Sequence, residues 1–238
     1  RVFDFSRDGI RRSLDESLAR FGLDRVDILF LHDPDDHWQQ AIDEALPTLA
    51  ALRDEGLVRS IGAGMNQSTM LTRFVRESDV DVVLLAGRYT LLDQRALDDL
   101  LPACLERGTS VVLGGVFNSG VLANPDRNVT YDYGQAPRDV IERAARIADI
   151  CAGHGVDVRA AALQFPVAHR AITTVVIGAR SRDEVEQNTQ YAGAVIPSQL
   201  WDDLRNEGLL RADAPVPTHR PADDSDRPDT DRNVSAPS

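Results

Sequence analysis

The chain has 238 residues and a formal net charge of −12. It contains 26 arginines and no lysine. So acidic a surface repels phosphate groups, which argues against nucleic acid or an anionic membrane as a partner. The length suits one domain with a substantial core, for which an α/β barrel is one candidate.

The two cysteines predict a reducing compartment. Cys104 and Cys151 both lie in helix-like stretches among alanines and leucines, where a small buried thiol is the ordinary outcome. No stretch approaches the roughly 20 apolar residues that a membrane span needs. Residues 1–20 also lack the apolar centre of a signal peptide. We therefore expect a cytoplasmic protein without disulfides.

The first predicted elements are a helix and a strand. Residues 5–23 carry apolar side chains every three or four positions, with Ser6 placed to cap the start and Gly22 to close the end. Residues 27–32 follow as an apolar run, which predicts a buried strand ending in His32.

The alternation of helix and strand then continues to about residue 210. Further helices are predicted at 41–55, 68–76, 93–107, 138–153, 159–167, from about 181, and at 197–210. Further strands are predicted at 59–66, 80–85, 110–113 and 172–177. Alternation at this spacing predicts a parallel sheet with helical crossovers.

Two segments stand apart from this pattern. The excursion through residues 118–120 and 124–135 is rich in asparagine, proline, glycine and tyrosine, which indicates a functional loop or lid. From residue 213 the apolar periodicity stops and Pro, Asp, Arg, Ser and Thr dominate. We therefore expect one domain over residues 1–212 and a disordered acidic tail over 213–238.

The strand at 172–177 leads into a candidate anion site. Its uncharged β-branched run predicts a buried strand and stops at the turn 178–182, and a helical pattern opens at Asp183. Free backbone N–H groups at a helix start, a small-residue turn and two arginines favour an anion such as a cofactor phosphate. The alternative is an ordinary strand–helix turn with two solvated arginines, and these residues alone leave both open.

The predicted strands number five, whereas a (β/α)8 barrel has eight strands and typically about 250 residues. Part of such a barrel is therefore missing from this sequence. Because the first predicted element is a helix, we expect the missing part at the amino end. Five strands leave two open edges, through which we expect oligomers to form unless another polypeptide completes the ring.

The motifs, in this order, resemble the aldo-keto reductase family, whose members are (β/α)8-barrel oxidoreductases that use NAD(P)H. Residues 24–32 are similar to the family's fourth strand, which ends in a catalytic histidine. Residues 57–66 are similar to its fifth strand, and 88–93 to the segment after its sixth. Residues 176–188 are similar to the eighth strand and the loop that holds the cofactor's phosphates and adenine. The implied fold is a partial TIM barrel made of strands four to eight.

The resemblance implies a set of site residues. His32 is the implied catalytic residue, as a donor that orients the substrate, and Asn66 the implied partner of the nicotinamide carboxamide. The other implied cofactor-binding residues are Gly178, Ala179, Arg180, Ser181, Gln187 and Asn188. The implied cofactor is NADP or NAD, because Arg180 and Arg182 favour a 2′-phosphate whereas Glu184 opposes it by charge.

Residues 113–122 look most like the sugar 1-dehydrogenase branch of that family, whose members oxidise aldoses to lactones. The chain departs from many relatives at Ala86, where they carry glutamine, and at Gly114, where they stack a tyrosine on the nicotinamide. The family's catalytic aspartate, tyrosine and lysine come from strands that this sequence does not contain, and it has no lysine at all. We therefore expect the chain as given to turn over an aldose very weakly or not at all.

Two other functions remain open. One is a noncatalytic module that keeps a nucleotide-binding surface for regulation or for pairing with another chain. The other is a metal-dependent hydrolase built on His32 and His37, although the loop between them would have to bend sharply, and we expect no metal. Tyr89 is predicted to pack rather than to catalyse. His154, His169 and His219 are predicted on the surface.

Overall fold

The computed structural model describes residues 3–123, 130–132 and 134–218. Its central feature is a five-stranded parallel sheet in the order β1-β2-β3-β4-β7. The strands are β1 (Val26–His32), β2 (Val58–Met65), β3 (Val82–Ala86), β4 (Ser110–Gly114) and β7 (Ile172–Val176). A short antiparallel hairpin, β5 (Thr130–Tyr131) with β6 (Gly134–Gln135), lies between β4 and β7 in the sequence. The five predicted strands and their parallel pairing are confirmed.

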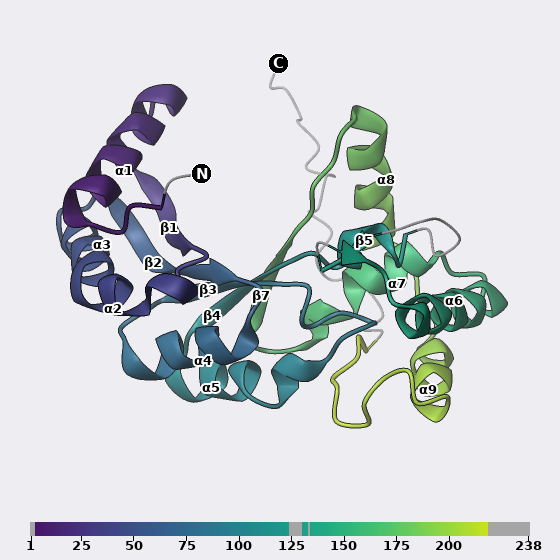
Figure 1. The fold of residues 1–238 in the computed structure, drawn as a ribbon. Coiled ribbons are helices and arrows are strands. Elements are labelled where there is room, and N and C mark those ends of the chain that lie inside the picture. The colour runs from purple at the N-terminus through teal and green to yellow at the C-terminus, as the bar shows by residue number, and fades with distance from the viewer. Residues whose placement is uncertain (1–2, 124–129, 133, 219–238) are drawn as a thin grey trace, which may run out of the picture.

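The helices pack around the outer side of this sheet, which is open and curved (Figure 1). They are α1 (Arg7–Phe21), α2 (Trp38–Gln40), α3 (Leu46–Asp54), α4 (Ser68–Glu77), α5 (Leu100–Arg107), α6 (Arg138–Gly153), α7 (Val158–Gln164), α8 (Arg182–Ala192) and α9 (Ser198–Asn206). The caps predicted for α1 are present: the Ser6 side chain accepts a hydrogen bond from the Gly9 N–H, and Gly22 closes the helix in the left-handed conformation.

The two outer strands are more exposed than the sequence predicts. Both were expected to be buried, yet Ile28 of β1 is 41% exposed and Val176 of β7 is 53% exposed. Within the described ranges β1 pairs only with β2, and β7 only with β4. Each outer strand therefore has a neighbour on one side only, whereas the central strands are enclosed by neighbours and helices.

Proline alters two of the predicted helices. The predicted helix at 41–55 opens with a π-helical turn, Ala41–Ala45, before α3 begins. Pro47 has no N–H and cannot donate the ordinary helical hydrogen bond to residue 43, which favours a wider turn. The predicted helix at 159–167 gives way to a 3-10 turn that begins at Pro166.

Local side-chain hydrogen bonds delay the start of another helix. The sequence predicts a helix at 93–107, but α5 begins only at residue 100. The Thr90 hydroxyl accepts the Asp93 N–H at 3.1 Å, and the Asp93 carboxylate accepts the Arg95 N–H at 3.0 Å. These bonds stabilise a turn in place of the first helical turns.

The packed part of the chain extends past the predicted domain boundary at 212. Ala214 is 1% exposed, and its carbonyl accepts a hydrogen bond from Arg205 Nη2 at 2.7 Å. Ala214, two residues past the predicted boundary, is therefore packed against the folded part of the chain. The rest of the predicted tail, residues 219–238, and most of the predicted loop at 124–135 lie outside the described residues.

Both cysteines are buried, as predicted, and burial raises the pKa of each thiol to about 12. The predicted surface position of His169 is wrong: this residue is 6% exposed, its Nδ1 accepts the Ala171 N–H at 3.2 Å, and burial lowers its pKa. Its ring packs against Tyr89, which is fully buried, so the predicted packing role of Tyr89 is confirmed.

No helix in the described ranges is both long enough and apolar enough to cross a bilayer.

Candidate functional site

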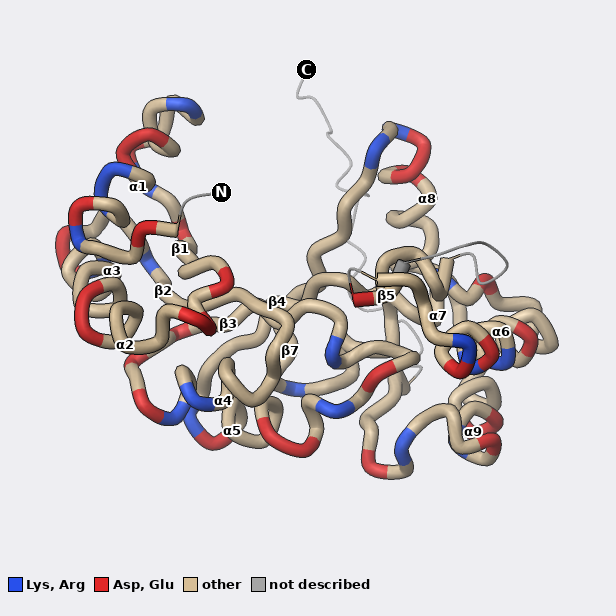
Figure 2. Tube along the Cα trace, viewed as in Figure 1, with Lys and Arg blue, Asp and Glu red and all other residues tan. Residues whose placement is uncertain are grey.

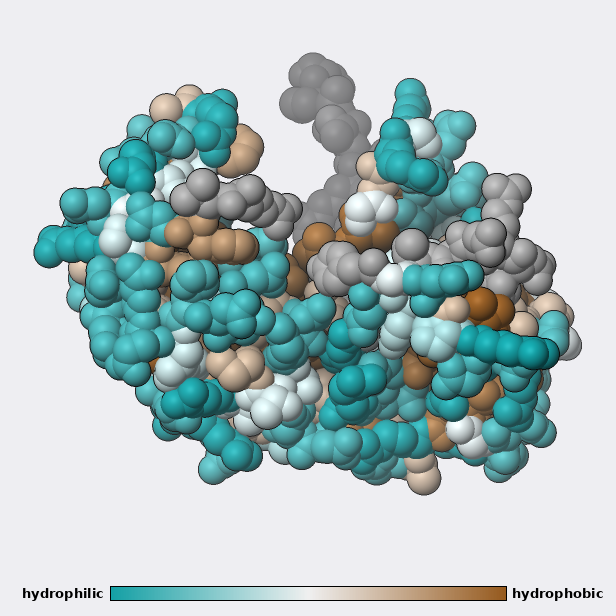
Figure 3. Space-filling view, in the orientation of Figure 1, coloured by the Kyte–Doolittle hydropathy of each residue, from teal (hydrophilic) through white to brown (hydrophobic). Residues whose placement is uncertain are grey.

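The predicted site residues follow the carboxyl ends of the strands. His32 is the last residue of β1, Asn66 follows β2, and Gly178 comes two residues after β7. Because the strands are parallel, these ends share one edge of the sheet. This edge is where parallel α/β folds place their ligands. Figure 3 shows the molecule hollowed on the side between α1 and α8, with apolar residues exposed in the hollow.

One cavity, of about 200 Å³, lies at the ends of β2, β3 and β4. It is lined by Asn66, Ala86, Gly87, Arg88, Gly115, Asn118, Ser119, Tyr131 and Asp132. Asn66 therefore faces a cavity, as the prediction of a binding role requires. Ala86, which differs from the glutamine of many relatives, contributes a small side chain to the same wall.

Asn118 bridges two loops of this cavity. It is 5% exposed, and its Nδ2 donates a hydrogen bond to the Gly87 carbonyl at 3.2 Å. Its Oδ1 is buried, and no donor of the described residues reaches it. The loops can approach because Gly115, at φ +68°, has no side chain: a Cβ there would lie 3.1 Å from the Gly87 nitrogen. The cavity wall thus holds a buried acceptor without a described partner.

A tight ion pair closes the other side of the cavity. Arg88 Nη2 lies 2.6 and 2.7 Å from the two carboxylate oxygens of Asp132. The Arg88 side chain is only 11% exposed and that of Asp132 is 43% exposed, so the pair joins the loop after β3 to the β5–β6 hairpin at the rim of the cavity. Burial also raises the pKa of the neighbouring Tyr131, which stays neutral at physiological pH.

A second pocket, of about 580 Å³, lies between the loop after β4 and the start of α8. It is lined by Phe117, Gly120, Ala123, Arg159, Gly178, Ala179, Arg180, Glu184, Gln187, Asn188 and Tyr191. Five of the six residues predicted in the last loop are among them. The sixth, Ser181, is the N-cap of α8, and its hydroxyl accepts the Glu184 N–H at 3.2 Å.

The shape and chemistry of this pocket fit the adenine and phosphate end of a dinucleotide. A Cβ built on Gly178 would meet no atom within 4 Å, so this part of the wall borders open space. Phe117 and Tyr191 provide aromatic surface on which a base can stack, and the Arg159 guanidinium lies 4.6 Å from the centre of the Tyr191 ring. Arg159 and Arg180 bring positive charge for phosphates.

One predicted anion donor is already engaged. The Arg180 backbone N–H donates to Glu184 Oε2 at 2.6 Å, and its Nη2 lies 3.1 Å from Glu184 Oε1. The Arg180 N–H is therefore not free to bind an anion, because the first turn of α8 supplies its own carboxylate. Glu184 stays ionised, since the Arg180 backbone N–H, and then its guanidinium, lower the pKa of this carboxyl.

Arg159 is held in place by Asp157, the N-cap of α7. Asp157 accepts the Arg159 backbone N–H at 2.9 Å, and two further bonds join it to the guanidinium, Nε at 2.9 Å and Nη2 at 2.5 Å. This contact holds the pKa of Asp157 below its ordinary value, mainly through the guanidinium bonds and against the opposing effect of burial. The pocket arginine is thus fixed by a residue that also starts the helix.

We expect Asp157→Asn to lower the melting temperature at pH 7, because the amide keeps the cap but loses the ion pair. A lowered pKa in the folded state stabilises above the unfolded value of 3.8, and this contribution is lost as the pH falls through the folded-state pKa. The difference from wild type should therefore shrink in acid. Thermal melts from pH 7 down to pH 2 check this, with exposed Glu106→Gln as the control. A difference that is constant across pH would contradict the assignment.

His32 is not brought into either cavity. Its side chain is 63% exposed, with Nε2 3.7 Å from Asp33 Oδ2. It borders a groove of about 400 Å³ between α1 and β1, together with Phe3, Phe5 and other residues. The His37 ring packs against Phe5, at 5.2 Å between ring centres. Within the described residues no group of three or more His, Cys, Asp or Glu side chains is arranged to hold a metal.

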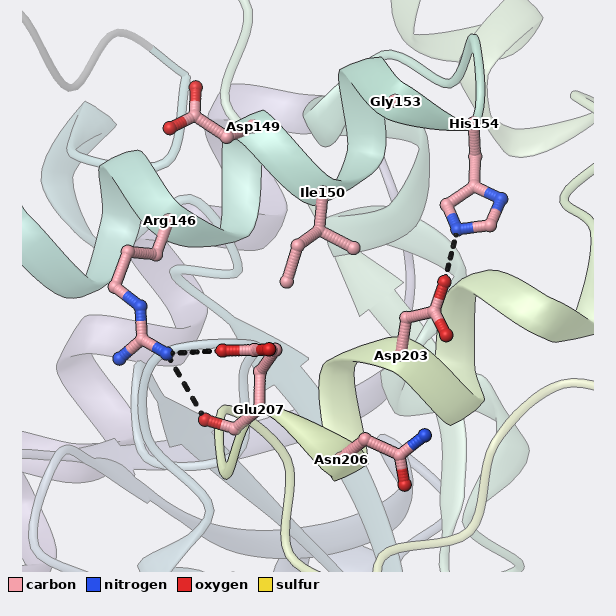
Figure 4. A pocket seen from close by; sticks show the side chains of 8 residues that line it. All are labelled: Arg146, Asp149, Ile150, Gly153, His154, Asp203, Asn206 and Glu207. Carbon is pink, nitrogen blue, oxygen red and sulfur yellow. Dashed lines mark hydrogen bonds and ion pairs between the residues drawn. The ribbon is translucent and has the colours of Figure 1, made fainter.

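A larger cavity, of about 790 Å³, lies between α6 and α9, and none of the predicted site residues lines it (Figure 4). Its charged side chains largely pair with one another. His154 Nε2 lies 2.8 Å from Asp203 Oδ2, and Arg146 Nη2 lies 2.8 Å from Glu207 Oε2. Size alone therefore does not identify the site.

Sequence reasoning missed three site residues: Asn118, Arg88 and Arg159. Asn118 lies in an Asn-Ser-Gly turn that was noted only as part of a loop, although asparagine is one of the few residues that adopt its φ of +48° readily. Nothing in the sequence next to Arg88 or Arg159 indicates that these arginines lie in the site. They reach the cavities only because the loop after β3 meets the hairpin and because α7 packs against α8.

Comparison with known proteins gives a consistent picture. A profile described as "Aldo/keto reductase family" matches residues 1–206. D-threo-aldose 1-dehydrogenase from Pseudomonas sp. is 46% identical over 213 residues, which cover 88% of this chain and 65% of that protein. Pyridoxal 4-dehydrogenase from Microbacterium luteolum is 39% identical over 220 residues, covering 88% and 64%. The chain thus spans slightly less than two thirds of the length of these two relatives, at 65% and 64%.

Solved structures show the same fold. The holo form of an aldo-keto reductase from Bacillus halodurans superimposes with a TM-score of 0.71 at 23% identity, over 88% of this chain and 69% of that one. A glycerol dehydrogenase from Gluconobacter oxydans gives a TM-score of 0.67 at 19% identity, over 86% and 65%. At these identities the likeness concerns the fold alone.

Proposed function

Because the chain belongs to the aldo/keto reductase family, we propose that it forms the cofactor-binding part of an NAD(P)-dependent oxidoreductase acting on an aldose or a similar carbonyl compound. The observation that carries the proposal is that one loop lines both cavities. Gly115, Asn118 and Ser119 face the Asn66 cavity, while Phe117 and Gly120 face the pocket at α8. Two adjoining cavities at the carboxyl ends of the strands suit the two ends of one extended dinucleotide.

The residues that line the two cavities can be assigned to the two ends of the dinucleotide. The Asn66 amide would orient the carboxamide of the nicotinamide, and Asn118 Oδ1, which has no described donor, would accept one of the carboxamide N–H groups. At the other end Gln187 and Asn188 border the adenine, while Arg159 and Arg180 face the phosphates. When bound, the cofactor supplies hydride-transfer chemistry.

We assign His32 the role of binding the substrate. Its position at the carboxyl end of β1, and the exposure of its ring, leave a nitrogen free to donate a hydrogen bond to a substrate carbonyl oxygen. The sequence holds no lysine with which the family's proton-transferring tyrosine could be tuned. For this reason we propose that the chain by itself binds the cofactor but turns over an aldose very weakly or not at all.

We further propose that β1 to β4 and β7 correspond to strands four to eight of a (β/α)8 barrel. The unbroken parallel order supports this, as does the exposure of apolar side chains on the two outer strands. The open edges of β1 and β7 would pair with further strands, either from an additional segment or from another copy of the chain. Two buried free thiols support a reducing, cytoplasmic setting.

Titration of the purified chain with NAD and NADP, followed by tryptophan fluorescence and calorimetry, tests the proposal. We expect saturable binding of at least one dinucleotide, competed by ADP-ribose. An assay with galactose and fucose should then give turnover close to background. Absence of binding by both dinucleotides would refute the cofactor role. Binding without turnover also fits the second candidate, a noncatalytic nucleotide-binding module, which is favoured if addition of any missing segment leaves turnover unchanged.

A further inference from the structure

An arginine and an aspartate meet at the rim of the Asn66 cavity. Arg88 comes two residues after β3, and Asp132 follows β5 at the turn of the β5–β6 hairpin. Figure 2 shows an acidic position directly beside β5. The other residues that line this cavity are uncharged, so the pair supplies all of the charge that the described lining contains.

The contact between these two side chains leaves hydrogen-bonding capacity unused. Arg88 Nη2 lies 2.6 and 2.7 Å from the two oxygens of Asp132, and Nη1 and Nε of Arg88 make no hydrogen bond with the described residues. Each carboxylate oxygen can also accept a second hydrogen bond. The pair therefore presents donors and acceptors side by side, which suits hydroxyl groups because a hydroxyl both donates and accepts.

The backbone of the hairpin fixes Asp132 in this place. Tyr131 pairs with Gly134, so Asp132 is the first residue of the turn between them, and its φ is +52°. Turns of this kind favour asparagine, aspartate or glycine, which adopt a positive φ with little strain. Asparagine would serve the turn as well but has no charge for Arg88. An exchange of Asp132 for asparagine therefore separates the role of the charge from that of the turn.

We propose that Arg88 and Asp132 together bind two neighbouring hydroxyl groups of the aldose and so determine the specificity of the site for a sugar. The inference rests on the proposed function and adds the residues that recognise the substrate. Tyr131 lines the same cavity, and its ring supplies apolar surface for the C–H face of a sugar.

The position of the pair suits a substrate that lies between the nicotinamide and His32. Hydride transfer requires the reacting carbon of the substrate to lie against the nicotinamide, so the substrate must lie beside the cavity assigned to the amide end. Only β2 separates β1 from β3, which places the ends of these two strands about 10 Å apart. One sugar can therefore direct its carbonyl end to His32 and its other hydroxyls to Arg88 and Asp132.

Ligand-observed NMR and calorimetry in saturating NADH or NADPH measure aldose binding without oxidation, because the reduced cofactor cannot accept a hydride. For the wild-type chain we expect galactose and fucose to bind about tenfold more tightly or better than cyclohexanol, a six-membered ring with one hydroxyl. Asp132→Asn should weaken binding of both aldoses about tenfold, because hydrogen bonds to a charged group are about twice as strong as neutral ones. Arg88→Lys should have a similar effect, because an ammonium keeps the charge but lacks the planar fork.

Asp79→Asn is the matched control. It also removes a carboxylate that pairs with an arginine, Arg53, at 2.8 Å, but Asp79 does not line the cavity. It should leave aldose binding unchanged, and both asparagine variants should keep their affinity for the reduced dinucleotide within about threefold.

Four results would overturn the inference: aldose affinity that is unchanged in Asp132→Asn, equal losses in the two asparagine variants, aldoses that bind no better than cyclohexanol, or a loss of dinucleotide affinity as large as the loss of aldose affinity. The last result would mean that the pair only holds the cavity wall. In each of these cases dinucleotide binding by the wild type leaves the cofactor role intact. Failure of both dinucleotides to bind the wild type would instead refute the proposed function, and the inference with it.

Discussion

Gly62→Ala is expected to destabilise the protein by about 4 kcal/mol or more, which is at the severe end for a single substitution. Gly62 lies in β2, opposite Val82 of β3 in the parallel register. A Cβ built on Gly62 would overlap the Val82 carbonyl oxygen and would lie 2.8 Å from its carbonyl carbon. Because both atoms belong to the backbone, no side chain can rotate away, and the two central strands would have to separate.

Urea denaturation followed by circular dichroism measures this effect. Gly64→Ala is the matched control on the same strand: its Cβ would lie 3.3 Å from the Leu84 Cβ and 3.8 Å from the Leu84 carbonyl oxygen, so a small shift accommodates it. We expect the Gly64 variant to remain folded with a modest loss of stability. Similar losses in the two variants would show that the close approach of Gly62 to Val82 does not determine the packing of β2 on β3.

Asn118→Ala is expected to weaken binding of the preferred nicotinamide dinucleotide by about 5- to 150-fold, because a buried acceptor or donor left without its partner costs about 1–3 kcal/mol. The substitution removes Oδ1, which we assign to the carboxamide, and the bond from Nδ2 to the Gly87 carbonyl. Calorimetric titration with the dinucleotide measures the loss.

ADP-ribose separates this role from a purely structural one. It lacks the nicotinamide, so its affinity for the pocket at α8 should change less than threefold in Asn118→Ala if the loop after β4 keeps its shape. Asn206→Ala, in the distant cavity between α6 and α9, controls for loss of an asparagine as such. Equal losses for the dinucleotide and for ADP-ribose would mean that Asn118 only holds the loop.

The sheet was predictable because its signals are local. Each strand is a short apolar run, and each helix has either a regular apolar period or a recognisable end, as at Ser6 and Gly22. The exposure of β1 and β7 was not predictable from their composition, since an apolar run looks the same in a central strand and at an edge. The predicted helices at 41–55 and 93–107 are altered by individual hydrogen bonds near Pro47 and Asp93. The spacing of apolar residues in the sequence does not reveal such bonds.

The site was predictable only in part. Five of the six predicted loop residues line one pocket, because they are close in sequence around one turn. Asn66 and Asn118 share a cavity although 52 positions separate them, and only the strand order brings them together. The engagement of Arg180 by Glu184 required the geometry of the first turn of α8. The catalytic assignment of His32 stays a prediction.

The two cavities are built on different parts of the sheet, so partial unfolding of one outer strand affects them unequally. The Asn66 cavity is built on β2, β3 and β4, in the interior, whereas the larger pocket depends on β7, an outer strand with one described neighbour. Fraying begins where a strand is held on one side only. If β7 detaches, the pocket proposed for the adenosine end is lost while the cavity proposed for the amide end persists. A dinucleotide that spans both would in turn hold this edge to the rest of the fold.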